Sequence, residues 1–512
     1  MWSSWRGIQG CLTSRRTLLD DADDSYDATG GGRNCVAPAA TEGDRQRWLC
    51  SRWVRGTSDS RVRHFPFGSI AALLPSPTTD RIPLSVASER TGWTADRVLY
   101  RGRTVVLKVR VSPDLIAGDV DEGYGKVADV FRRNMTSGQE VGAAVAVYRD
   151  GVKVVDLWGG FRNGITKAPW EEDTLALMFS TTKGVSALAV AVAASRGLIS
   201  YDARVADYWP EFAQASKGAI TVRQLLSHQA GLPILDPPPT LDDVRDTAKL
   251  SAMLAAQAPA WTPGARHGYH ALTLGWYESE LIRHADPLGR SLGQFFADEV
   301  AKPLGLDFHI GLPASVDRDR VAQLHCWSHA EMMLHLNVLP IRFLAATFNP
   351  RSLTLRAVTI KGMSTFDDNN RDDVRAVEIP AGNGIGSARS VAKAYGSVAT
   401  GGSDLGLTPT TLDALTQPAT PPTHGLRDKV MHVDMVFSLG YIKPFPKLVF
   451  GSSSKAFGTP GLGGSFGCAD PDTGIGFAYV MNRLGFHLWS DPRELALRQV
   501  LFHDIVGARS QT

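Results

Sequence analysis

The stretch TLALMFSTTKGVSALAVAVAASRGLIS, from Thr174 to Ser200, decides the fold of this chain. Its apolar start, Leu175 to Phe179, is typical of a buried strand. The small apolar residues from Val185 to Ser195 are typical of a buried helix. Ser180 is therefore expected at the junction of a strand and a helix, close to the first helical turn.

Ser180-Thr181-Thr182-Lys183 is a Ser-x-x-Lys tetrad at this junction. Residues three apart on a helix share a face, so the amine of Lys183 can approach the hydroxyl of Ser180. A serine hydroxyl needs an adjacent base to act as a nucleophile, and burial lowers the pKa of a lysine toward that role. The alternative is a helix-capping serine followed by a solvated lysine, because this short pattern recurs by chance.

Composition narrows the class of protein. The 512 residues are 43% hydrophobic and 21% charged, as in a soluble globular protein, and the net charge of +2 gives no reason to expect nucleic acid as a partner. Five scattered cysteines without a CxxC pair argue against a disulfide framework and favour a reducing compartment. The sequence contains no run of 18 or more apolar residues, so no membrane-spanning helix is expected. These features predict a cytoplasmic protein, with peripheral or cell-envelope association left open.

Two regions differ in character. Residues 1–112 are rich in Arg, Ser, Asp, Gly and Pro, and they predict a disordered or loosely packed extension, with a strand pair near Val98–Val111. Residues 113–512 predict one α+β domain: an antiparallel sheet flanked by helices, whose strands come from both ends, with an inserted helical subdomain at about 200–430.

Local signals support this arrangement. Asp150-Gly151 lies between two β-rich runs in Val141–Gly160 and predicts a hairpin. The stretch Asp242–Gln257 has helical periodicity, Ser291 and Ser387 are expected helix N-caps, and Pro492 is expected to begin a final helix.

Two further segments could complete a site around Ser180. Tyr269-His270-Ala271 offers a phenol that could exchange protons with a lysine and a serine, its pKa lowered by neighbouring cations; alone, it would be a core aromatic residue. Thr459-Pro460-Gly461-Leu462-Gly463-Gly464 is a glycine-rich strand end that could bring a backbone N–H to a substrate; alone, it would be a β-bulge.

The order and spacing of these segments resemble the serine β-lactamase-like family, and within it the family VIII carboxylesterases and actinobacterial lipase/esterases related to class C β-lactamases. The resemblance covers about Leu115–Val506 and includes the runs FSTTKG, LLSHQAGLP, WTPGARHGYHALTLGW, PLGL and FGTPGLGGSFGCADPDTGIGFAYVMN.

The resemblance implies a β-lactamase/transpeptidase-like fold and an acyl-enzyme on Ser180. Lys183 and Tyr269 would be the general base and acid, and the N–H groups of Ser180 and Leu462 would form the oxyanion hole. Thr459, Gly461 and Gly463 would border the substrate pocket. No cofactor and no metal are implied.

One position departs from the family pattern. Penicillin-recognising enzymes carry Lys-Thr-Gly in the third motif, where this chain has Thr459-Pro460-Gly461. The missing lysine would pair with a substrate carboxylate, so its absence favours neutral, apolar esters. The preferred hypothesis is therefore a carboxylesterase or lipase acting on a small ester or lipid. The alternatives are a β-lactamase or D-Ala-D-Ala peptidase, and a catalytically silent binding protein of the same fold.

Three other features have simpler interpretations. Gly463–Gly467 matches the nucleophile elbow G-x-S-x-G, but a turn and a strand, rather than a helix, are expected after Ser465. The cluster His325, Cys326, His329 and His335 lacks a known zinc spacing. The apolar run Met332–Phe348 is interpreted as ordinary core in preference to an acyl pocket or a lid.

Overall fold

The computed structural model describes residues 96–100, 103–108 and 111–508. Trp93–Thr512 form one unit, and the other unit, Trp2–Gly92, lies outside the described residues. Most of the predicted extension 1–112 therefore lies outside them too. Its expected strand pair is present as β1 (Asp96–Tyr100) and β2 (Arg103–Lys108), which pair antiparallel.

The main sheet joins the two ends of the domain. Its strands run in the order β10-β11-β12-β4-β5-β3, and every pairing between them is antiparallel. Because β12 from the C-terminal part pairs with β4 from the N-terminal part, the predicted antiparallel sheet built from both ends is confirmed. The strands are β3 (Ile116–Val120), β4 (Gly142–Arg149), β5 (Val152–Asn163), β10 (Phe457–Pro460), β11 (Phe466–Asp470) and β12 (Ile475–Met481), with β6 (Ala168–Pro169) paired to β5.

The predicted hairpin is also confirmed. Asp150 and Gly151 both have positive φ, 52° and 80°, at the turn between β4 and β5. A two-residue turn of this kind matches the twist of the strands, and glycine accepts the conformation without a steric cost.

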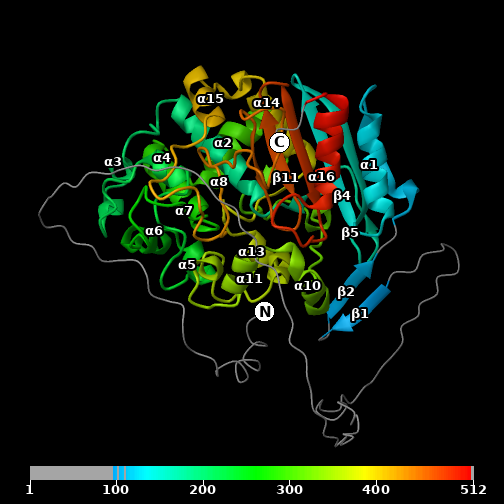
Figure 1. Cartoon of the computed structure of the whole chain (residues 1–512), viewed down its shortest axis with the longest axis horizontal. Helices are drawn as coiled ribbons and strands as arrows, with labels where there is room; N and C mark the ends of the chain where they lie inside the picture. Colours follow the sequence, from blue (N-terminus) through cyan, green and yellow to red (C-terminus); the bar gives the residue numbers. More distant parts are fainter. Residues whose placement is uncertain (1–95, 101–102, 109–110, 509–512) are drawn as a thin grey trace, which may run out of the picture. The chain divides into compact units, whose positions relative to one another are not determined.

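Strand β4 is buried on both faces. Its residues Ala144, Ala146 and Tyr148 belong to one hydrophobic cluster, and the alternating residues Ala143, Val145 and Val147 belong to another. The first cluster includes residues of α2 (Thr181–Ser195) and α14 (Ala388–Ala399), and the second includes residues of α1 (Gly125–Thr136) and α16 (Pro492–Gln499). The sheet thus has helices on both sides (Figure 1). Alternate side chains of one strand serve two cores, because successive Cβ atoms point to opposite faces.

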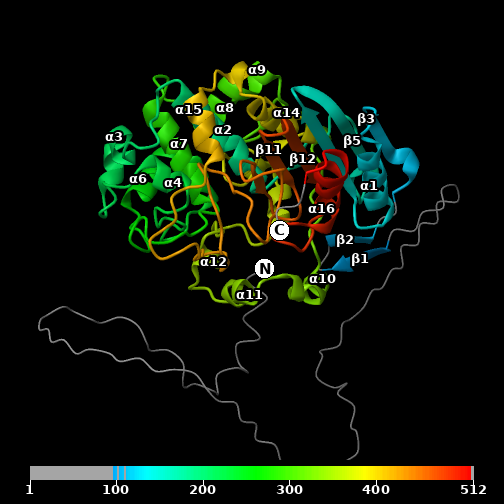
Figure 2. The same ribbon diagram turned by 45° about the horizontal axis from the view of Figure 1, so that its top comes forward.

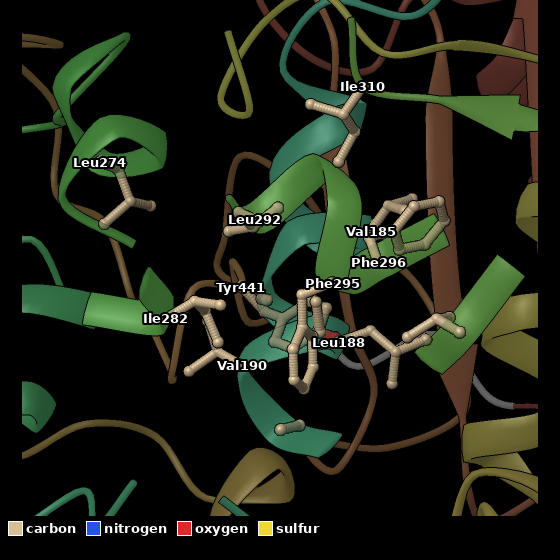
Figure 3. Packing of buried hydrophobic residues seen from close by; sticks show 14 of the residues in the cluster. Val185, Leu188, Val190, Leu274, Ile282, Leu292, Phe295, Phe296, Ile310 and Tyr441 are labelled. Carbon is tan, nitrogen blue, oxygen red and sulfur yellow. The ribbon is translucent and has the colours of Figure 1, made fainter. Parts of the chain in front are cut away.

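Helix α2 (Thr181–Ser195) lies inside the first core. Every residue from Thr181 to Ala193 is buried. Val185, Leu188 and Val190 of α2 lie among Ile282, Phe295 and Tyr441 (Figure 3). A helix with small apolar residues on all sides can be surrounded by other elements, so its N-terminal end is held firmly in place.

The middle of the chain is helical, with a small sheet β7-β9-β8. The N-caps Ser291 and Ser387 and the start at Pro492 are confirmed. The single helix expected over Asp242–Gln257 is wrong: Asp246 leaves the helical conformation and caps a second helix through Lys249 N. The elements are α3 (Val205–Tyr208), α4 (Val222–Leu226), α5 (Leu241–Arg245), α6 (Thr247–Ala256), α7 (Thr273–Ala285), α8 (Leu292–Phe296), α9 (Lys302–Leu304), α10 (His329–Leu334), α11 (Ile341–Thr347), α12 (Leu353–Arg356), α13 (Asp372–Arg375), α15 (Pro409–Thr416), β7 (Ala176–Leu177), β8 (Phe308–His309) and β9 (Ile385–Gly386).

The apolar run Met332–Phe348 is not core, so its preferred interpretation is wrong. It forms α10 and α11, and Leu334 and Ile341 are 78% and 77% exposed. Both helices lie along the same edge of the molecule in two views (Figure 1, Figure 2). Hydrophobic composition alone does not tell whether the chain supplies a partner for such a run.

Candidate active site

Ser180 lies in a strained turn at the start of α2. It is the helix N-cap, with φ −66° and ψ −10°, and Phe179 before it has φ 45°. A bulky residue in the left-handed region is uncommon and must be held there by its surroundings. Thr182 does this, because its hydroxyl donates to Phe179 O at 2.6 Å and accepts from Gly384 N at 2.9 Å.

Lys183 is buried beneath Ser180. Its Nζ lies 3.1 Å from Ser180 Oγ and 2.7 Å from each of two carbonyl oxygens, of Ala271 and Ala381. The side chain is 1% exposed, and this burial lowers the pKa of Lys183 to about 7. A lysine with that pKa has a substantial neutral fraction near neutral pH, unlike a solvated one.

Tyr269 lies beside both Ser180 and Lys183. Its hydroxyl lies near enough to the Ser180 side chain to interact with it, and its ring centroid lies 4.8 Å from Lys183 Nζ. Burial raises the pKa of Tyr269 above its usual value, which is opposite to the lowering expected from neighbouring cations. At neutral pH the residue is therefore an un-ionised phenol, able to donate a proton.

The turn between β10 and β11 packs against residues 178–181, the segment that contains Ser180. Ser465 Oγ donates to Met178 O at 2.8 Å and lies 3.1 Å from Thr181 Oγ1. A Cβ built on Gly461 would lie 2.3 Å from Met178 O, so only glycine permits this approach. The turn carries Leu462. Within the described part of the chain, the N–H groups of Ser180 and Leu462 have no protein acceptor.

The three residues expected to border the substrate pocket, Thr459, Gly461 and Gly463, lie in different environments. Thr459 is 1% exposed, and among the described residues its hydroxyl has no hydrogen-bond partner. This burial removes the Thr459 side chain from the groups that a bound ester could contact. Gly461 lies against Met178, and Gly463 O accepts from Arg493 at 2.7 Å and from Gly485 N at 2.8 Å.

Ser465 is not placed as a nucleophile. It is 1% exposed, and it is followed by β11 rather than by a helix. Its two contacts instead join the β10–β11 turn to the segment around Ser180. The rejection of the G-x-S-x-G match agrees with this placement.

Sequence reasoning missed two parts of the site. In the turn at residues 380–384, Ala381 O accepts from Lys183 Nζ, and Gly384 O accepts from Met178 N at 3.0 Å. Glu278 on α7 is fully buried, and neither of its carboxylate oxygens has a hydrogen-bond partner among the described residues. Burial raises the pKa of Glu278 to about 8, and its charge raises that of Lys183. A glutamate within a helical apolar pattern was the available signal for it.

Two histidines of the cluster considered as a metal site, His325 and His335, make other contacts. His325 Nε2 accepts from Gly164 N at 3.0 Å, and His335 stacks on Phe486 with ring centroids 3.8 Å apart. Among the described residues, no group of three or more His, Cys, Asp or Glu side chains is arranged to hold a metal ion. A search of the same residues found no helix with the length and hydropathy of a membrane span.

Comparisons with known proteins show the family of the chain. The Beta-lactamase family model matches residues 127–500. The esterase/beta-lactamase LipL of Mycobacterium tuberculosis is 34% identical over 374 residues, which are 72% of this chain and 83% of that protein.

Solved structures extend the comparison. The crystal structure of a family VIII carboxylesterase is 38% identical, with a TM-score of 0.67, and the match covers 76% of this chain and 99% of that one. A penicillin-binding protein homolog from Caulobacter crescentus is 36% identical, with a TM-score of 0.65 and the same coverage. The chain therefore belongs to the beta-lactamase family, and it is a serine hydrolase with the β-lactamase/transpeptidase-like fold that the sequence predicted.

Proposed function

We propose that this protein is a carboxylesterase or lipase that cleaves carboxylic esters through an acyl-enzyme on Ser180. The observation that supports this most is the environment of Lys183 Nζ, 3.1 Å from Ser180 Oγ and bonded to two carbonyl oxygens. The neutral amine has two N–H groups. When both donate to Ala271 O and Ala381 O, its lone pair faces the hydroxyl of Ser180, and Lys183 serves as the general base.

The remaining steps follow from the neighbouring groups. Ser180 Oγ attacks the ester carbonyl carbon and its proton moves to Lys183 Nζ. The N–H groups of Ser180 and Leu462 stabilise the oxyanion. When the C–O bond breaks, Tyr269 donates its proton to the leaving alcohol and regains one from Lys183. Water then attacks the acyl-enzyme by the same route and releases the acid.

The third motif supports an uncharged substrate. Thr459 is buried, and no lysine stands at that position to pair with a substrate carboxylate. The relatives named as esterases point the same way. β-Lactamase activity is the second candidate, because LipL is named for both activities. Turnover of nitrocefin exceeding that of p-nitrophenyl esters would favour the second. A cytoplasmic location remains a prediction.

Covalent labelling tests the proposal directly. A fluorophosphonate probe is expected to label the wild-type chain and the Ser465→Ala variant, but not the Ser180→Ala variant, because Ser180 has a neighbouring amine, whereas Ser465 contacts Met178 O and Thr181 Oγ1. Labelling is measured by intact-protein mass spectrometry. If Ser180→Ala is still labelled, Ser180 is not the nucleophile.

The pH dependence of the reaction tests the base. Because only neutral Lys183 accepts a proton, kcat/KM is expected to rise with pH through about 7 and to level off above it. Because the pKa of Glu278 is about 8, its carboxylate forms in the wild type only over the upper part of this rise, where it holds part of Lys183 in the ammonium form. In Glu278→Gln that charge is absent, so the rise is expected to level off at a lower pH. The measurement is kcat/KM for p-nitrophenyl acetate from pH 5 to 9.

Glu280→Gln is the matched control. Glu280 lies on the same helix and is 3% exposed, but its carboxylate is bonded to Ser251 and Arg283. Its replacement is expected to leave the profile in place. An identical pH profile for Glu278→Gln and the wild type would contradict the role given to Glu278.

A further inference from the structure

The largest exposed apolar side chains gather on one segment. Of the seven large hydrophobic residues exposed in the described chain, five lie between residues 333 and 358: Met333, Leu334, Ile341, Phe348 and Val358. Ile341, Ala345 and Phe348 are spaced four and three residues apart and are all exposed, so one face of α11 and the residue that ends it turns apolar groups outward. We name Met333, Leu334, Ile341 and Phe348 the apolar edge.

The same segment carries an excess of positive charge. Residues 332–366 contain Arg342, Arg351, Arg356 and Lys361 and no Asp or Glu, whereas the whole chain has a net charge of only +2. Arg356 pairs with Asp236 at 2.7 Å. Arg342, Arg351 and Lys361 are exposed, and the ion pairs of the described residues include none of them.

Neighbouring loops add to this charge. Arg342 lies close enough to His432 to act on it electrostatically, together with Arg427 and Lys429. The loop at 430–432 is tied to α12 by Thr354, whose hydroxyl donates to Val430 O at 2.7 Å. Arg342 and Lys429 therefore belong to one surface, on which Asp434 pairs with Arg427 at 3.6 Å.

A hollow adjoins the start of α11. It has a volume of about 360 Å³, and its walls include Leu339, Pro340, Leu488 and Trp489, with Lys447 at its border. Apolar walls beside an exposed lysine suit an acyl chain with a negatively charged head group.

We infer that the apolar edge and its flanking arginines dock on the surface of an anionic phospholipid bilayer. Interfacial segments combine Leu, Ile and Phe on one side with Arg and Lys beside them, because the apolar groups enter the acyl boundary while the cations remain with the phosphates. A protein partner would need a complementary shape, whereas a lipid surface needs only this pairing of apolar side chains and cations. The docking does not depend on the proposed function; the delivery of a lipid-dissolved ester to Ser180 does.

A series of contacts between aromatic rings leads from the apolar edge to the turn at Phe179 and Ser180. His335, at the end of α10, stacks on Phe486, and Phe486 lies 5.9 Å from Trp327. Trp327 contacts Phe366 at 5.4 Å, and Phe366 contacts Phe179, the residue before Ser180, at 6.2 Å. Docking would therefore place the bilayer next to the segment that these rings connect to the turn at Phe179 and Ser180.

Vesicle co-sedimentation of the full chain tests this inference. The vesicles are phosphatidylcholine alone, or phosphatidylcholine with about one third phosphatidylglycerol. The wild type is expected to sediment with the anionic vesicles and to be released by high salt. Leu334→Ser/Ile341→Ser and Arg342→Glu/Arg351→Glu are each expected to lower the partition coefficient by about tenfold or more. Controls are Leu288→Ser, which changes a residue that is 74% exposed elsewhere, and Lys302→Glu on α9.

The outcomes separate docking from catalysis. All five proteins are expected to hydrolyse dissolved p-nitrophenyl acetate equally, so a failure of the proposed function shows in that assay and a failure of docking does not. The inference is overturned if the wild type stays in the supernatant, or if the edge variants bind as well as the controls. It is also overturned if light scattering without vesicles shows a dimer that only Leu334→Ser/Ile341→Ser dissociates, because the edge then covers a second copy of the chain.

Discussion

Lys183→Met is expected to lower kcat/KM for p-nitrophenyl esters by about 10³-fold or more. Methionine fills a similar volume, but its thioether sulfur is too weak a base to take the proton of Ser180, and positioned general bases contribute about 10²–10⁴-fold. Two buried carbonyl oxygens, of Ala271 and Ala381, also lose their donor. The loss of these bonds costs about 1–3 kcal/mol of stability.

Lys217→Met separates the two effects. Lys217 is also fully buried and donates to three carbonyl oxygens, of Gln214, Ala255 and Gln257, at 2.8, 2.6 and 2.8 Å. Burial lowers its pKa to about 8, but among the described residues its amine is hydrogen-bonded to no hydroxyl group. The variant is expected to lose stability to a similar degree and to keep its kcat/KM within about threefold. If Lys183→Met retained a tenth of the wild-type activity while folded, another group would have to be the base.

Arg493→Met is expected to lower the free energy of unfolding by about 3–5 kcal/mol. Its guanidinium bonds to Glu140 at 3.0 Å and to Asp491 at 2.8 Å, and all three side chains are at most 5% exposed. Removing the cation leaves two carboxylates buried without their partner. The same guanidinium donates to Gly463 O, next to Leu462, so activity is expected to fall beyond the loss of folded protein.

Arg498→Met is the control for this variant. Arg498 and Glu494 form another buried pair, at 2.8 Å and with at most 3% exposure. Among the described residues, the guanidinium of Arg498 bonds to Glu494 and Val449 O and lies over the ring of Phe466, but it has no hydrogen bond to the turn between β10 and β11. Urea unfolding gives the stability of each protein, and kcat/KM is measured in the absence of urea. We expect both variants to be destabilised and only Arg493→Met to show a lower kcat/KM. Equal kcat/KM values would mean that Arg493 does not position the turn.

Much of the fold was predictable because its signals are local. Asp150-Gly151 predicts its hairpin from backbone conformation alone, and Ser291 and Ser387 cap helices through bonds to residues three positions away. The order of the three motifs also predicted which distant segments meet. The break at Asp246 was not predicted, since helical periodicity continues across it.

The site was predicted less completely. Ser180, Lys183 and Tyr269 are brought together, but the carbonyl of Ala381 that holds Lys183 is a main-chain group, which any residue type supplies. The contact of Ser465 with Met178 spans 287 positions of sequence. No local pattern reports such a contact, because it depends on how β10 and β11 lie against α2.

The sequence by itself determined the antiparallel sheet, the buried central helix and the approach of Lys183 to Ser180, because periodicity, turn chemistry and motif spacing act over a few residues. Only the tertiary structure decided that Glu278 is buried close enough to Lys183 to change its pKa, and that Thr459 is buried. It also decided that the run from Met332 to Phe348 lies at the surface. Burial is a property of what the rest of the chain places around a residue, and the same burial sets the pKa of Lys183.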